Sequence, residues 1–165
     1  MNYKILLCYI LLLGALCSCQ SSQSGCRYEA PSAIFTDIQQ IDPISFTQNG
    51  QTGIEKVHIP SLHLDFELIQ SGCDQLKQEC RFLLNGTYPQ DASAAECAKD
   101  IANILYSIST FDSSLSDFSS WAEMLFQQSS AFSYDTPLLM PESGIRSSIL
   151  KQHLPGKTIL TLIIE

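Results

Sequence analysis

The chain is short of basic residues. Nine Lys and Arg stand against 17 Asp and Glu in 165 residues, which gives a formal net charge of −8 at pH 7. The basic residues are scattered singly, so the sequence contains no basic patch. Binding to a phosphate backbone requires clustered Lys and Arg. We therefore expect no nucleic-acid partner.

Long hydrophobic runs are also missing. The longest follows Lys4, covers residues 5–16, and is shorter than the roughly 20 apolar residues of a membrane-spanning helix. Its charged start and the end Leu16-Cys17-Ser18-Cys19 are typical of a bacterial lipoprotein signal peptide. Cys17 is the poorer acceptor, because Leu16 would then lie at −1, where a small side chain is needed. We expect residues 1–18 to be removed and Cys19 to be acylated.

The segment after Cys19 is polar. Residues 20–25 read Gln-Ser-Ser-Gln-Ser-Gly, and we assign residues 19–32 to a flexible tether. Residues 33–165 are enough for a single domain with its own core. No acidic residue directly follows Cys19, so an acidic surface-export signal is missing. We expect a protein anchored by its lipid in the bacterial cell envelope, at the periplasmic face of the outer membrane.

Catalytic signatures are absent from the sequence. It contains no Gly-x-Ser-x-Gly elbow, no glycine-rich phosphate loop and no His-Glu-x-x-His. Three histidines and many serines give no reason to choose one triad over another. The sequence thus gives no positive evidence for an enzyme, and we assign no catalytic residue, metal or cofactor.

Four cysteines remain after the signal peptide and Cys19 are set aside: Cys26, Cys73, Cys80 and Cys97. Their spacings of 47, 7 and 17 lack the close Cys pairs of a zinc site. An even number in an exported chain indicates disulfides, with three possible connectivities, and buried free thiols are the alternative. Cys73–Cys80 is the simplest pair to place, because both flank a short connection between apolar runs. Cys26–Cys97 would then be the second bond.

A period of two dominates the middle of the chain. Apolar Leu62, Leu64, Phe66 and Leu68 alternate with polar residues over 62–68, which predicts a half-buried strand. Pro60 separates it from a shorter strand before it. We predict a partner strand over residues 80–84 and a final strand over residues 158–164.

Two helices are expected between these strands. Ser93 and Glu96 form a capping box, and apolar residues recur at helical spacing from 97 to 108. A second helix starts near Ser114-x-x-Asp117, with Trp121 on an apolar face that favours core packing over an aromatic binding platform. The order of strands, helices and strands predicts an α+β domain, an antiparallel sheet with two helices packed on it.

The polar residues of the alternating strand are the candidate binding surface. His63, Asp65 and Glu67 would share one face, with about 7 Å between neighbours. Such a row suits weak contact with a cation or a sugar, although the solvent face of any strand has the same alternation. His58, five residues before His63, would lie on the opposite face.

Several of these features together resemble a known family. The alternating strand is followed by Asp91-Ala92-Ser93-Ala94-Ala95 at a helix start, and later by Ser-Ser-Ala-Phe-Ser-Tyr-Asp at residues 129–135. The pattern resembles the exported domain of unknown function found in lysozyme-sensing anti-sigma factors and N-terminal to some peptidoglycan deacetylases. The family's Tyr-Thr-Gly-Gly-Ala-His-like stretch and second subdomain are missing here, as in a short or truncated form. The resemblance implies an α+β binding module and carries over no catalytic residue.

We therefore expect a membrane-anchored, non-catalytic binding module for an envelope protein or a cell-wall glycan such as peptidoglycan. One alternative is a small hydrolase of cell-wall or other polymers, with the row of His63, Asp65 and Glu67 in its site. Another is an accessory subunit of an envelope complex.

Overall fold

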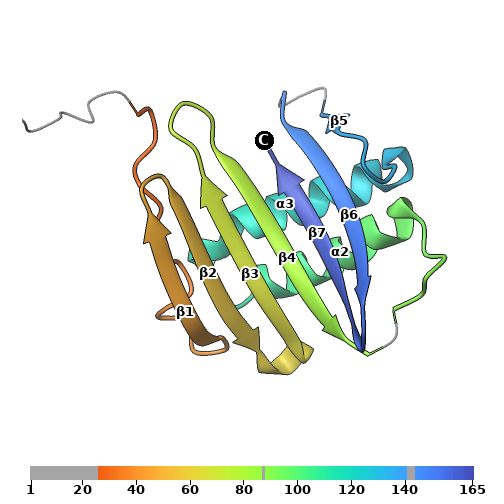
Figure 1. Cartoon of the computed structure of the whole chain (residues 1–165), viewed down its shortest axis with the longest axis horizontal. Helices are drawn as coiled ribbons and strands as arrows, with labels where there is room; N and C mark the ends of the chain where they lie inside the picture. Colours follow the sequence, from red (N-terminus) through yellow and green to blue (C-terminus); the bar gives the residue numbers. More distant parts are fainter. Residues whose placement is uncertain (1–25, 87, 141–143) are drawn as a thin grey trace, which may run out of the picture.

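The structure, a computed structural model, describes residues 26–86, 88–140 and 144–165. The predicted signal peptide, Cys19 and residues 20–25 lie outside the described residues. A seven-stranded antiparallel sheet carries two helices on one face (Figure 1). This arrangement confirms the predicted α+β fold. No helix in the described ranges is long and apolar enough to cross a membrane.

The first four strands form a meander. They are β1 (Asp42–Asn49), β2 (Thr52–Ile59), β3 (Leu64–Ser71) and β4 (Lys77–Asn85). Gly50, with a φ of 58°, takes the left-handed conformation that the tight turn after Asn49 requires. A short 3-10 turn, η1 (Pro60–Leu62), connects β2 to β3. The predicted break at Pro60 is therefore present.

The helices and three more strands follow. Helix α2 (Ala94–Ser109) leads through the 3-10 turn η2 (Ser113–Leu115) to α3 (Ser116–Gln128). Strands β5 (Leu138–Leu139), β6 (Arg146–Leu154) and β7 (Lys157–Ile164) complete the sheet. The spatial order is β1-β2-β3-β4-β7-β6-β5, so β7 lies between β4 and β6. The predicted strand over residues 158–164 is thus an interior strand of the sheet.

Local capping explains where α2 starts. The Ser93 hydroxyl accepts from the Glu96 amide at 3.2 Å, and the Glu96 carboxylate accepts from the Ser93 amide at 2.8 Å. The predicted capping box is present, and it satisfies two amides that a helix start leaves unpaired. Apolar residues at helical spacing then bury one side of α2 against the sheet, among them Cys97, Ile101, Leu105 and Ile108.

Four phenylalanines form the centre of the core. Phe66 of β3 lies 5.1 Å from Phe82 of β4 and 5.7 Å from Phe35, measured between ring centroids. Phe118 of α3 stacks on Phe35 at 5.8 Å. Phe35 belongs to the segment before β1, which is held by a buried carboxylate. Glu55 of β2 accepts from the amides of residues 34 and 35 at 2.8 and 3.0 Å.

Candidate functional site

The predicted row of polar residues is only partly formed. Asp65 and Glu67 lie on β3, on the face turned away from the helices. His63 does not belong to that strand, because it ends the η1 turn with a left-handed backbone and a φ of 48°. Its amide donates to the carbonyl of Pro60 at 3.1 Å. The expectation of one three-residue row on one strand is wrong, since the turn after Pro60 extends through Leu62.

His58 is the histidine that lies beside Asp65. The two residues are opposite each other in the register of β2 and β3, and His58 Nδ1 lies 2.7 Å from Asp65 Oδ1. The prediction that His58 lies on the face opposite the row of His63, Asp65 and Glu67 is wrong, because β2 presents His58 on the same face as Asp65. Only the strand register, which the sequence pattern did not supply, brings it to Asp65.

Ion pairs cross the open face of β2, β3 and β4. Glu67 accepts from Lys56 at 2.8 Å and lies 3.5 Å from Arg81, whose Nε donates to Glu79 at 2.6 Å. These charged groups therefore have partners on neighbouring strands. Among the described residues, no group of three or more His, Cys, Asp or Glu side chains is arranged to hold a metal ion.

The other half of the open face is apolar. Leu83 of β4 pairs with Ile159 of β7, and Thr161 of β7 pairs with Leu150 of β6. Leu83, Ile159, Leu150 and the nearby Ile163 are half-buried. Figure 1 shows both helices on the opposite side of the sheet, so neither helix covers these aliphatic side chains. We call these four residues the aliphatic patch.

The cysteines pair differently from either predicted bond. Cys26 is bonded to Cys73, with a Cα–Cα distance of 4.5 Å, whereas Cys80 and Cys97 are free and buried. Cys80 points into the core from β4, and burial raises the pKa of its thiol. Cys73 lies in the hairpin beyond the end of the sheet, so the Cys73–Cys80 pair is not formed. The bond also attaches residues 26–32 of the predicted tether to the domain.

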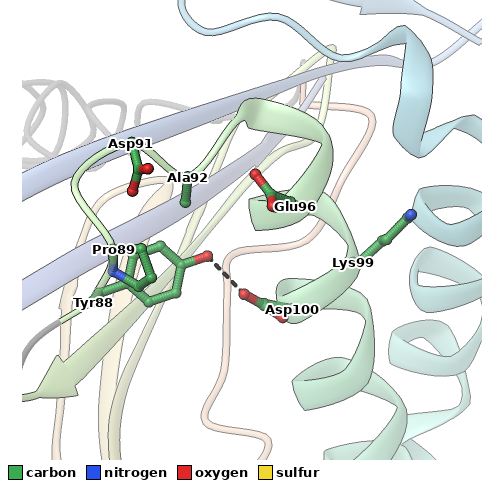
Figure 2. A pocket seen from close by; sticks show the side chains of 7 residues that line it. All are labelled: Tyr88, Pro89, Asp91, Ala92, Glu96, Lys99 and Asp100. Atoms are coloured by element: carbon green, nitrogen blue, oxygen red, sulfur yellow. Dashed lines mark hydrogen bonds between the residues drawn. The ribbon is translucent and has the colours of Figure 1, made fainter.

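A pocket of about 280 Å³ lies beside the start of α2 (Figure 2). The Tyr88 hydroxyl donates to Asp100 at 2.7 Å and to Cys97 Sγ at 3.3 Å. Burial and these two hydrogen bonds raise the pKa of Tyr88. Glu96 is engaged in the capping box. The hydrogen bonds from Tyr88 to Asp100 and Cys97 connect the loop before α2 to the helix.

Two further contacts secure the same loop. The Ala92 carbonyl accepts from the Tyr134 hydroxyl at 2.6 Å and from Lys151 Nζ at 2.7 Å. Lys151 also lies 5.1 Å from the centre of the Tyr134 ring. Sequence reasoning missed this cluster because its members come from β6, α2 and two loops. These contacts hold the loop before α2 against β6 and against the segment that contains Tyr134.

Comparison with known proteins adds no assignment. No family model, no curated protein and no solved structure matches this chain. The resemblance described above therefore remains a prediction.

Proposed function

We propose that this chain is a lipid-anchored protein of the bacterial cell envelope and that its domain is a non-catalytic binding module for a protein partner. The binding surface is the open face of the sheet. One observation carries the proposal: the helices lie on one face only, and the other presents the aliphatic patch next to a ladder of ion pairs. An uncovered apolar surface with a polar border is typical of a protein interface.

Charge favours a cationic partner over an anionic polymer. The net charge of −8 attracts a basic protein and repels acidic glycans or lipids. The charged side chains of the open face already pair with one another, so a partner meets an ordered polar border. The aliphatic patch supplies the apolar area whose burial stabilises a complex.

Acylation of Cys19 is tested by substitution. We expect Cys19→Ser to leave the precursor uncleaved and without a fatty-acid label, because the acceptor thiol is lost. Cys17→Ser is the matched control and should be processed normally. A label that persists in Cys19→Ser and disappears in Cys17→Ser would assign the lipid to Cys17.

Site-specific crosslinking tests the binding surface. A photoreactive residue at Ile159, in the intact membrane-bound protein, should crosslink to a discrete partner. The same probe at Tyr106, which is 58% exposed on α2, should not. The identified partner should then bind the purified protein, more weakly at high salt, and Ile159→Asp should abolish that binding. Lysozyme is the first purified protein to try, because the resembled family includes lysozyme-sensing proteins.

The hydrolase alternative has its own assay. Peptidoglycan fragments and model esters, with and without divalent metal, should give no turnover. Turnover that His63→Ala abolishes would overturn the binding-module proposal. Crosslinking that is equal at Ile159 and Tyr106 would instead remove the open face as the binding surface.

A further inference from the structure

A groove of about 700 Å³ lies at one end of the sheet. It is found where the β3–β4 hairpin, the start of α3 and the first residue of β6 meet. Trp121, Tyr28 and Leu76 supply its apolar lining. Trp121 packs edge-to-face on Phe118 at 5.0 Å, and Tyr28 and Leu76 are 36% and 39% exposed. Nothing assigned so far uses this groove.

The disulfide fixes the position of residues that line one side of the groove. The Cys73 carbonyl accepts from the amides of Arg27 and Tyr28 at 2.9 and 3.1 Å. Together with the Cys26–Cys73 bond, these contacts hold Arg27 and Tyr28 beside the hairpin that carries Asp74 and Leu76. The apolar and charged groups of this side are therefore fixed relative to each other.

Charges of both signs line the groove, and one of them, Glu165, pairs with Lys77 at 2.8 Å. The Arg27 side chain contacts the Tyr28 ring, with 5.7 Å between its guanidinium carbon and the ring centre. Within the described part of the chain, Arg146, Asp74 and Asp117 form no ion pair within 4 Å and no side-chain hydrogen bond. Arg27, Arg146, Asp74 and Asp117 therefore remain available to a ligand, whereas Lys56, Glu67, Glu79 and Arg81 of the open face pair with one another. Guanidinium groups match phosphate, and carboxylates match an ammonium group.

The length of the chain before Cys26 limits how far the groove can lie from the lipid. This step rests on the proposed acylation of Cys19. Cys26 follows Cys19 by seven positions, and a fully extended chain of that length reaches at most about 25 Å. Arg27 and Tyr28 follow Cys26 directly and line the groove. The groove is thus confined to the membrane-proximal end of the domain.

We propose that this end of the domain docks onto the bilayer surface and that the groove binds a zwitterionic phosphoethanolamine headgroup. Arg27 and Arg146 face the phosphate, and Asp74 and Asp117 face the ammonium group. Trp121 and Tyr28 lie at the level of the headgroups, where amphipathic rings are favoured. The net charge of −8 opposes binding to a purely anionic membrane surface. This repulsion favours a headgroup with no net charge.

Trp121 is the only tryptophan of the chain, so its fluorescence reports on the groove directly. The full acylated protein is reconstituted in nanodiscs of phosphatidylcholine alone or mixed with phosphatidylethanolamine or phosphatidylglycerol. We expect phosphatidylethanolamine to shift the Trp121 emission to the blue and to permit quenching by a headgroup spin label. The double variant R27E/R146E should lose both effects. Lys157→Glu, at the opposite end of β7, should keep both.

Several outcomes would overturn the proposal. One is a Trp121 emission that is the same in all three kinds of nanodisc. Another is quenching that survives in R27E/R146E, in a protein with an unchanged circular dichroism spectrum. A third is a response to soluble O-phosphoethanolamine without a response to nanodiscs. A protein that carries no lipid by mass spectrometry would instead contradict the proposed function. An acylated protein whose Trp121 does not respond contradicts the groove assignment alone.

Discussion

Strands β2, β3 and β4 each have an apolar face and a face that carries charged residues. Residues adjacent in sequence form the two faces. On the helix-covered face, three apolar side chains pair across β2, β3 and β4 and are fully buried: Val57, Phe66 and Phe82. One step along each strand, three charged side chains pair across the open face, 18–47% exposed: Lys56, Glu67 and Arg81. Because successive side chains of a strand point to opposite faces, the apolar row and the row of ion pairs lie on opposite faces of the same strands.

The two rows contribute to stability very differently. Full burial of a large apolar side chain stabilises a protein by about 1.5–3 kcal/mol. An exposed ion pair contributes about 0–1 kcal/mol, because water already solvates its charges. The covered face therefore holds the domain together, and the open face can vary or bind without unfolding it.

The largest expected effect comes from a charge on the covered face. Phe66→Asp places an unpaired carboxylate among the core phenylalanines, and we expect a loss of at least about 4 kcal/mol or complete unfolding. Chemical denaturation of the purified protein measures this loss. Phe66→Leu, the matched control, should cost about 1–2 kcal/mol. A Phe66→Asp protein as stable as the control would show that the core is elsewhere.

Removal of the disulfide should have the next largest effect. The bond joins residues 47 positions apart, so Cys26→Ser with Cys73→Ser should lower the free energy of unfolding by about 3–4 kcal/mol. Mass spectrometry of the unreduced, denatured protein should find a Cys26–Cys73 peptide and alkylated Cys80 and Cys97. A peptide that links Cys73 to Cys80 would contradict the structure.

Removal of the buried carboxylate of β2 should cause the third largest loss of stability. Glu55→Ala leaves the amides of residues 34 and 35 without an acceptor, and we expect a loss of about 2 kcal/mol. Hydrogen exchange at these two amides should become faster in the variant. Glu55→Gln keeps one carbonyl oxygen as acceptor and should lose less. Unchanged exchange in Glu55→Ala would mean that the segment before β1 is held by its apolar side chains alone.

The smallest effect is expected on the open face. Glu67→Ala removes the carboxylate that joins Lys56 to Arg81, and we expect the free energy of unfolding to change by less than about 0.5 kcal/mol. His63→Ala, in the turn before β3, should be equally mild. If these variants lost as much unfolding free energy as Phe66→Asp, the open face would contribute as much to stability as the covered face.

Local patterns in the sequence were enough to predict several elements. The alternation over residues 62–68, of which 64–68 belong to β3, the capping box of Ser93 and Glu96, and the final strand each depend on residues close in sequence. Long-range pairings were not predictable in the same way. The partner of Cys73, the place of β7 beside β4 and the contact of His58 with Asp65 depend on how distant segments meet. The candidate row failed at His63 because a proline marks a break but not the length of the turn that follows.

The position of β7 also constrains when the domain can fold. This strand, the last in sequence, joins β1–β4 on one side to β6 and β5 on the other. A chain that crosses a membrane from its N-terminus cannot complete the sheet until residues 157–164 have emerged. Cys26 and Cys73 both emerge long before that, so oxidation can restrict the chain while its apolar row is still unpaired. Under the proposed export, the chain could therefore carry the Cys26–Cys73 bond before β7 takes its place between β4 and β6.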